Sequence, residues 1–196
     1  MVRVFYKYSN LSVNYYICAM FNDFKPILKI LLRFVIIYLV MVFLYQVYLD
    51  RTGRISLDPF SIFVGEQVTA VQNFFGISSK IEILENQQAA RFIVIDKYVS
   101  RMVEGCNAIS VMILFLAFIF AFYKGFKTFV FAIAGLVLLH IMNVLRIAGL
   151  NWVLYFYPPE GKMFHDYIFP AIIYGSVVVL WLVWINYFAL KKSKNA

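Results

Sequence analysis

The chain has 196 residues, of which 63% are hydrophobic and 14% are charged, and its net charge is +8. Soluble domains carry roughly 45–50% apolar and about 25% charged residues, so this composition excludes an ordinary soluble enzyme and indicates a protein surrounded by lipid. The positive charge is spread between apolar runs as an orientation signal, so no nucleic-acid partner is expected. The sequence predicts an all-α integral membrane protein with about four transmembrane helices.

Residues 1–26 form a basic, aromatic segment without a long apolar run, and no cleavable signal peptide is evident in it. Met20 is an alternative start of the chain. Cys18 lies in this segment and is interpreted as an incidental thiol, because two cysteines do not make a disulfide framework. The first span is predicted at residues 27–48, which supply the roughly 20 apolar residues that a membrane helix needs.

Residues 49–105 form the only long segment outside the predicted spans. Apolar residues at helical spacing from Pro59 to Phe75 predict an amphipathic helix that lies on the bilayer. Two short β-patterns, at residues 81–85 and 91–95, flank a polar turn and predict a β-hairpin. Residues 96–104 are expected to lead back to the membrane.

Three further apolar stretches predict spans at residues 106–123, 128–156 and 167–190. A tight basic turn joins the first two, an outer loop at residues 157–166 joins the last two, and a basic tail at residues 191–196 closes the chain. Four spans place both termini on the same side of the membrane.

The distribution of basic residues predicts the orientation of these spans. The segments on the side of the two termini carry ten Lys and Arg residues against one Asp, whereas residues 50–105 carry six basic and seven acidic residues. Because cytoplasmic loops are enriched in Lys and Arg, both termini are expected inside and residues 50–105 outside.

Cys106 lies at the predicted outer end of the second span, within the stretch Glu-Gly-Cys-Asn. At the helical rise, Cys106 lies about 26 Å and Arg146 about 27 Å from the basic turn that joins their spans. Spans joined by so short a turn are antiparallel neighbours, so these two residues are level with each other. His165 begins the fourth span on the same face. The sequence therefore predicts that three reactive residues converge at the outer surface.

This trio suits nucleophilic catalysis. A thiolate attacks carbonyl carbon, and the positive end of the helix expected to begin at Cys106 would stabilise it, as would the Arg146 guanidinium. Arg146 is also suited to stabilising an oxyanion, and His165 to transferring protons.

Three polar neighbours are predicted to support the trio. Asp166 is expected to orient the imidazole of His165. Asn143, on nearly the same helix face as Arg146, is expected to hold the guanidinium, and Asn107 is expected to position substrate.

Each residue of the trio also has a structural interpretation. A cysteine at a helix end is often only a tolerated small residue, an arginine near an interface extends to the headgroups, and a histidine in a loop is ordinarily solvated. Their convergence at one depth favours the catalytic interpretation, because ionisable residues within spans are usually functional or paired.

Three short stretches of the chain resemble the exosortase/archaeosortase family of membrane cysteine enzymes, most closely the small exosortase subtype F of Bacteroidetes. They are Glu-Gly-Cys-Asn-Ala-Ile-Ser around Cys106, Asn-Val-Leu-Arg-Ile around Arg146 and Phe-His-Asp-Tyr-Ile-Phe-Pro around His165. The resemblance covers about residues 25–190. It implies a multi-pass protein of the bacterial inner membrane whose active site faces the periplasm.

The resemblance also implies a cysteine protease or transpeptidase, with Cys106 as nucleophile, Arg146 as oxyanion or thiolate stabiliser and His165 as acid and base. Its substrates would be exported proteins that end in a recognition motif, a membrane helix and a basic tail. Cleavage would proceed through a thioester to an unknown acceptor nucleophile, and no cofactor is expected. Larger exosortases have about twice as many spans and often carry Ser-Gly after the cysteine, where this chain has Asn107-Ala108.

Two other classes of function remain open from the sequence. The first is a non-enzymatic membrane subunit of a surface-protein or polysaccharide export system, which would not need Cys106. The second is a haem or metal protein that uses the two histidines of the chain, His140 and His165. His140 lies about 9 Å below Arg146 in the predicted span, and a hydrogen bond between helices is its ordinary role.

Overall fold

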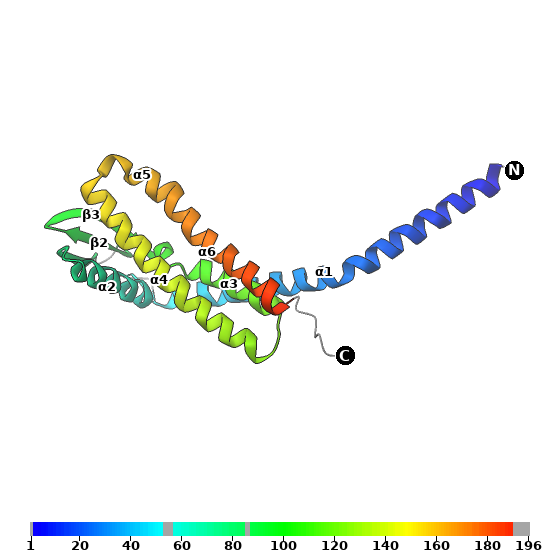
Figure 1. Cartoon of the computed structure of the whole chain (residues 1–196), viewed down its shortest axis with the longest axis horizontal. Coiled ribbons are helices and arrows are strands. Elements are labelled where there is room, and N and C mark those ends of the chain that lie inside the picture. Colours follow the sequence, from blue (N-terminus) through cyan, green and yellow to red (C-terminus); the bar gives the residue numbers. More distant parts are fainter. Residues whose placement is uncertain (1, 53–56, 85–86, 190–196) are drawn as a thin grey trace.

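The computed structural model describes residues 2–52, 57–84 and 87–189, with side chains from residue 24 onward except residue 189. The side chain of Cys18 therefore lies outside the described residues. The elements in chain order are α1 (Val2–Thr52), α2 (Pro59–Phe74), β1 (Ser79–Leu84), β2 (Ala89–Val94), β3 (Lys97–Val103), α3 (Ile109–Ala121), α4 (Phe126–Phe156), α5 (Gly161–Met163) and α6 (Phe169–Trp184). The sheet and α2 lie at one end of the helices, and the turn between α3 and α4 lies at the other (Figure 1).

Among the described residues, three helical segments are long and apolar enough to cross a membrane: Phe24–Thr52, Phe126–Phe156 and Pro158–Phe188. None of the most apolar window of the first segment is buried within the protein, so its apolar side chains need lipid or another apolar partner. The second predicted span, at residues 106–123, contains only the 13-residue α3, which is about 20 Å long and shorter than a full span.

The segment between the first two predicted spans forms a small antiparallel sheet with the strand order β1-β2-β3. The chain is mostly helical, as expected, and the predicted hairpin corresponds to β1 and β2. β3 adds a third strand where the sequence predicts only a connection. Met102 is the one buried residue of β3, while Lys97 and Arg101 are exposed. Apolar and polar residues hardly alternate in β3, so its sequence gives only a weak strand signal. The strand therefore forms mainly because it pairs with β2.

Helix α2 occurs where predicted, but its apolar face packs on the rest of the protein, where the sequence predicts contact with the bilayer. Val64 and Val68 are fully buried. They share a core with Phe92 of the sheet and with Val144 and Ile147 of α4. An amphipathic pattern predicts an apolar neighbour but does not distinguish lipid from the rest of the chain.

Helices α3, α4 and α6 pack around a second core that contains Phe115, Leu139 and Trp184. A Cβ atom at Gly135 of α4 would collide with the ring of Phe115 of α3, so glycine permits the close approach of these two helices. The predicted pairing of the second and third apolar segments as neighbours is confirmed. This packing holds the start of α3, next to Cys106, beside the part of α4 that carries Asn143 and Arg146.

Candidate active site

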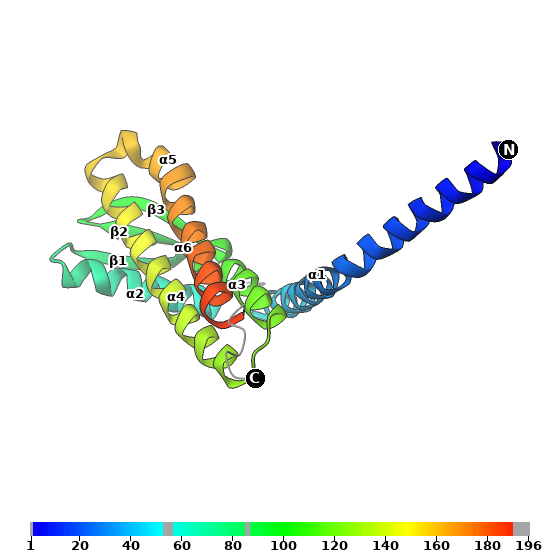
Figure 2. The same ribbon diagram turned by 45° about the vertical axis from the view of Figure 1, so that its right-hand side comes forward.

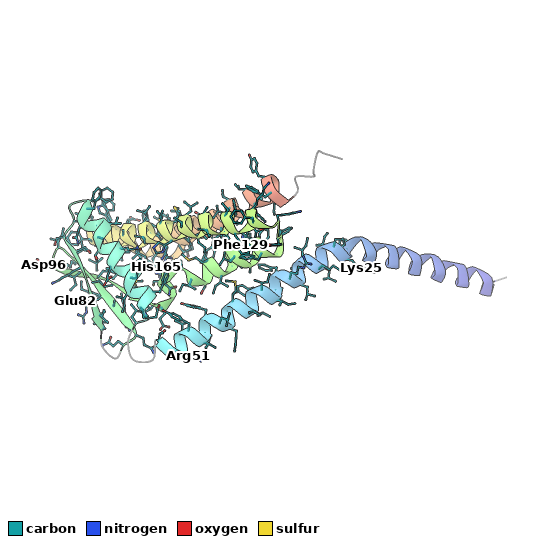
Figure 3. All side chains as sticks on the ribbon, turned by 90° about the horizontal axis from the view of Figure 1, so that it is seen from below. Lys25, Arg51, Glu82, Asp96, Phe129 and His165 are labelled. Atoms are coloured by element: carbon teal, nitrogen blue, oxygen red, sulfur yellow. The ribbon has the colours of Figure 1, made fainter. Side chains whose placement is uncertain are left out.

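The three residues with predicted catalytic roles line a single cavity of about 310 Å³. Cys106 comes from the turn after β3, Arg146 from α4 and His165 from the helical segment before α6. In Figure 3, His165 lies between Glu82 and Asp96 of the sheet region on one side and Phe129 of α4 on the other. The cavity therefore lies where the sheet meets the ends of the helices.

Cys106 is half-buried and lies in a 3-10 turn formed by Glu104–Asn107. The prediction that Cys106 opens the following helix is wrong, because α3 begins at Ile109. Ala108 separates the two elements with a φ of 60°. The Asn107 side-chain oxygen accepts a hydrogen bond of 2.9 Å from the Ile109 amide, so one free amide at the start of α3 is already satisfied.

Asn107 is a structural residue of this turn. Its side chain is buried, with 1% exposed, and its Nδ2 donates to the Tyr45 hydroxyl at 3.0 Å and to Ser61 Oγ at 3.1 Å. Asn107, which is predicted to position substrate, is not among the residues that line the cavity of Cys106. Its hydrogen bonds connect the turn that carries Cys106 to α1 and α2, and so fix the position of the thiol.

Asp58 belongs to the same support and has no role in the sequence-based prediction. It is fully buried, and its Oδ1 accepts hydrogen bonds from the Phe60 and Ser61 amides at the start of α2. The Tyr48 hydroxyl of α1 donates to the same oxygen at 3.4 Å. An Asp followed by Pro59 is a typical start of a helix, so the cap could have been found from the sequence, but its contact with α1 could not.

Arg146 and Asn143 both contact the main chain of Cys106. Asn143 Nδ2 donates to the Cys106 carbonyl oxygen at 3.1 Å, and Arg146 Nη2 donates to the same oxygen at 3.4 Å. Asn143 is fully buried. Asn143 was predicted to hold the Arg146 guanidinium, but instead both side chains donate to the same carbonyl oxygen. Arg146 Nε is buried and has no hydrogen-bond partner among the described residues, so the guanidinium retains donor capacity beside the cysteine.

His165 lies in a wide, π-helical turn, Phe164–Ile168, that continues into α6. The predicted outer loop at residues 157–166 is therefore largely helical. His165 Nδ1 lies 2.8 Å from Asp166 Oδ1, so the carboxylate holds the ring as expected and favours the tautomer with its proton on Nδ1. Nε2 is then the basic nitrogen. Both side chains are well exposed, at 66% and 41%.

His140 lies at a different place. It lines a separate groove between α2 and α4, its Nε2 is 2.6 Å from Gln67 Oε1, and its ring lies beside those of Phe60 and Phe63. The hydrogen bond between helices expected for His140 is confirmed. His140 and His165 line different cavities, so they do not form one shared haem or metal site.

Burial raises the pKa of the Glu104 carboxyl above its ordinary value, and the nearby Asp58 carboxylate raises it further. A raised carboxyl pKa means that protonated Glu104 stabilises the folded state, and that this stabilisation is lost as the pH rises through the raised pKa. We expect Glu104→Gln to raise the thermal midpoint slightly at pH 7, by at most about 2 °C, and to have no effect near pH 3. Unfolding of purified protein at both pH values measures this, with the exposed Glu160→Gln as control. A larger gain at pH 3 than at pH 7 would contradict the assignment.

Ala108 adopts the left-handed conformation that favours glycine, directly beside the turn of Cys106. We expect Ala108→Gly to keep the thermal midpoint nearly unchanged, because relief of the strained φ offsets the added flexibility of the unfolded chain. Ala108→Val should cost about 2 kcal/mol or more, since the site is buried and a β-branched residue tolerates this φ poorly. Equal stability of the two variants, measured by thermal unfolding, would show that this backbone conformation is not needed.

No protein-family description, curated protein or solved structure matches the chain.

Proposed function

We propose that this protein is a membrane-embedded, exosortase-like cysteine protease or transpeptidase. It cleaves the C-terminal sorting signals of exported proteins at the outer face of a bacterial inner membrane. The observation that carries the proposal is the shared cavity: a half-buried thiol, a half-buried guanidinium and an exposed imidazole, supplied by three segments of the chain, line one space of about 310 Å³. Nucleophile, oxyanion stabiliser and proton carrier are the groups that acyl transfer requires.

In the first step, Nε2 of His165 accepts the proton of the Cys106 thiol, and the sulfur attacks the carbonyl carbon of the scissile peptide bond. The electron pair of the carbonyl moves to its oxygen, and Arg146 stabilises that oxyanion. The oxyanion then re-forms the carbonyl, the C–N bond breaks, and His165 returns the proton to the leaving amine. The product is a thioester between Cys106 and the new C-terminus of the substrate.

In the second step, the acceptor attacks the thioester carbonyl. His165 takes a proton from this nucleophile, the C–S bond breaks, and the Cys106 thiol is restored. Water as acceptor gives hydrolysis, and an amine or another nucleophile of the envelope gives transfer. Both outcomes use the same residues.

The backbone at Ala108 agrees with the resemblance on which the proposal rests. Larger exosortases often carry glycine two residues after the cysteine, and in this chain that position has a φ of 60°. Glycine adopts this φ without the steric cost that a Cβ imposes. A conserved turn shape after the nucleophile would explain why glycine suits the larger enzymes and why a small residue stands here.

The membrane setting rests on the three long apolar segments and on the charge asymmetry of the sequence. The lipid bilayer surrounds the helices, and the cavity at the sheet end faces the periplasm. This arrangement suits substrates that are held in the membrane by a C-terminal helix with a basic tail.

The test is to make Cys106→Ala in cells that also express a candidate tailed protein, and to follow the size of that protein on a gel. Cys18→Ala is the matched control, because it removes the other cysteine of the chain. Accumulation of the unprocessed, membrane-retained precursor only in the Cys106 variant, at normal enzyme levels, supports the proposal. Normal processing in both variants would contradict it and favour the non-enzymatic membrane subunit.

A further inference from the structure

One wall of the active-site cavity is the free edge of β3. Within the described ranges, β3 pairs with β2 on one side and has no strand on the other. In Figure 2, β3 is the strand of the sheet that lies nearest the turn between α4 and α5. Its unpaired side therefore faces the segment that carries His165.

The cavity runs along this strand. Five consecutive residues of β3, Tyr98 to Met102, line it. Successive side chains of a strand point to opposite faces, so a cavity against one face would touch only every second residue. Ser100, Arg101 and Met102 pair regularly with β2, so contact with all three indicates that the cavity reaches the strand edge, where backbone N–H and C=O groups are available. Val99 lies at a shift in the register, and Phe92 of β2 also lines the cavity.

Cys106 lies at one end of this edge, three residues after the last residue of β3. The opposite wall is formed by one face of α4, which contributes Arg146, Leu150 and Leu154 at successive helical turns, and by Phe169. The Ser100 hydroxyl donates to the Asn151 side-chain oxygen at 2.6 Å and holds β3 against α4. A peptide lying along β3 would therefore have α4 on its other side, and it would lead to the Cys106 thiol.

We propose that the substrate binds in an extended conformation, by adding a strand to the free edge of β3, so that its scissile carbonyl reaches Cys106. The inference rests on the proposed function and specifies how that site selects its substrate. Strand addition uses main-chain hydrogen bonds for affinity and alternate side chains for specificity. Tyr98 to Met102 span about 17 Å, which is enough for about five residues of the substrate.

An extended peptide is the occupant that matches this wall chemically. A helical tail satisfies its own backbone hydrogen bonds and offers none to a strand edge, and lipid offers no donors. An unpaired edge is also a site of unwanted association unless it is covered. The segment around the scissile bond must therefore be unwound when it enters the cavity, while the substrate's membrane helix remains outside it.

The experiment uses the full-length protein in detergent micelles and the probe acetyl-tetra-alanyl chloromethyl ketone. The Cys106 sulfur forms a bond to the methylene carbon, the C–Cl bond breaks, chloride leaves, and the thiol proton passes to His165 or buffer. For each probe, the rate of Cys106 alkylation, followed by mass spectrometry, is divided by the rate at which the same probe alkylates free glutathione. We expect the tetra-alanyl probe to react about tenfold faster than the acetyl-alanyl analogue on this corrected scale.

The decisive series places a single N-methyl group at each peptide nitrogen of the probe in turn. In a paired strand only every second residue directs its N–H to the neighbour, so N-methylation at alternate positions should slow alkylation about tenfold and the intervening positions should have little effect. Cys106→Ser is the control for labelling at the intended site, and labelling of Cys18 reports non-specific reaction.

The outcomes separate this inference from the proposed function. If iodoacetamide alkylates Cys106 but the peptide probes show no dependence on length or on the N-methylated position, strand addition is wrong and the nucleophile is unaffected. If cells with Cys106→Ala process tailed proteins normally, the proposed function fails whatever the probes show. An effect of N-methylation that is equal at every position would also overturn pairing with β3.

Discussion

Cys106→Ser is expected to lower the rate of substrate processing by about 10³-fold or more. A serine hydroxyl remains protonated at neutral pH, and it is a much weaker nucleophile than a thiolate without a base adapted to it. The substitution changes one atom in a half-buried turn whose structure is held by neighbouring residues, so folding should be preserved. The loss therefore reports chemistry and not the presence of the protein.

The measurement is the disappearance of a tailed precursor in membranes that contain equal amounts of each variant. Hydroxylamine added to the wild-type reaction should divert the thioester to a hydroxamate, with release of the Cys106 thiol. The Cys106→Ser variant should form no hydroxamate, and Cys18→Ser should behave as wild type. Processing by Cys106→Ser within tenfold of the wild-type rate would exclude a thioester mechanism.

His165→Ala is expected to lower the rate by about 10²–10⁴-fold, the usual contribution of a positioned acid and base. The side chain is 66% exposed, so its removal should leave the thermal midpoint nearly unchanged. Asp166→Asn keeps the His165 ring but weakens the contact that orients it, and we expect this variant to lower the rate about tenfold. The two losses should not add, because both act through one imidazole.

The chain contains a matched control, since His140 is its only other histidine. His140→Ala removes a ring that lines the groove with Gln67 and does not line the cavity of Cys106. We expect it to leave processing intact. Added imidazole should restore part of the activity of His165→Ala and none of that of Cys106→Ala. Equal losses in the two histidine variants, without rescue by imidazole, would remove His165 from the mechanism.

The sequence by itself determined the membrane class of the protein and the relative depth of its reactive residues. Long apolar runs need apolar surroundings wherever they pack, and the helical rise converts residue spacing into depth. For this reason Cys106 and Arg146 could be placed level before any contact was known. The bounds of α4 and the existence of α2 followed from equally local signals, an apolar run in one case and an amphipathic pattern in the other.

Only the tertiary structure decided which neighbours these patterns meet. The apolar face of α2 was assigned to lipid, but it packs on Phe92 and Val144, because periodicity is the same for either partner. Asn107 was assigned to substrate, but hydrogen bonds to Tyr45 and Ser61, distant in sequence, bury it. Strand β3 exists through its pairing with β2, so its edge beside Cys106 could not be seen in the sequence. Local spacing sets element type and depth, whereas burial and strand pairing depend on contacts between distant segments.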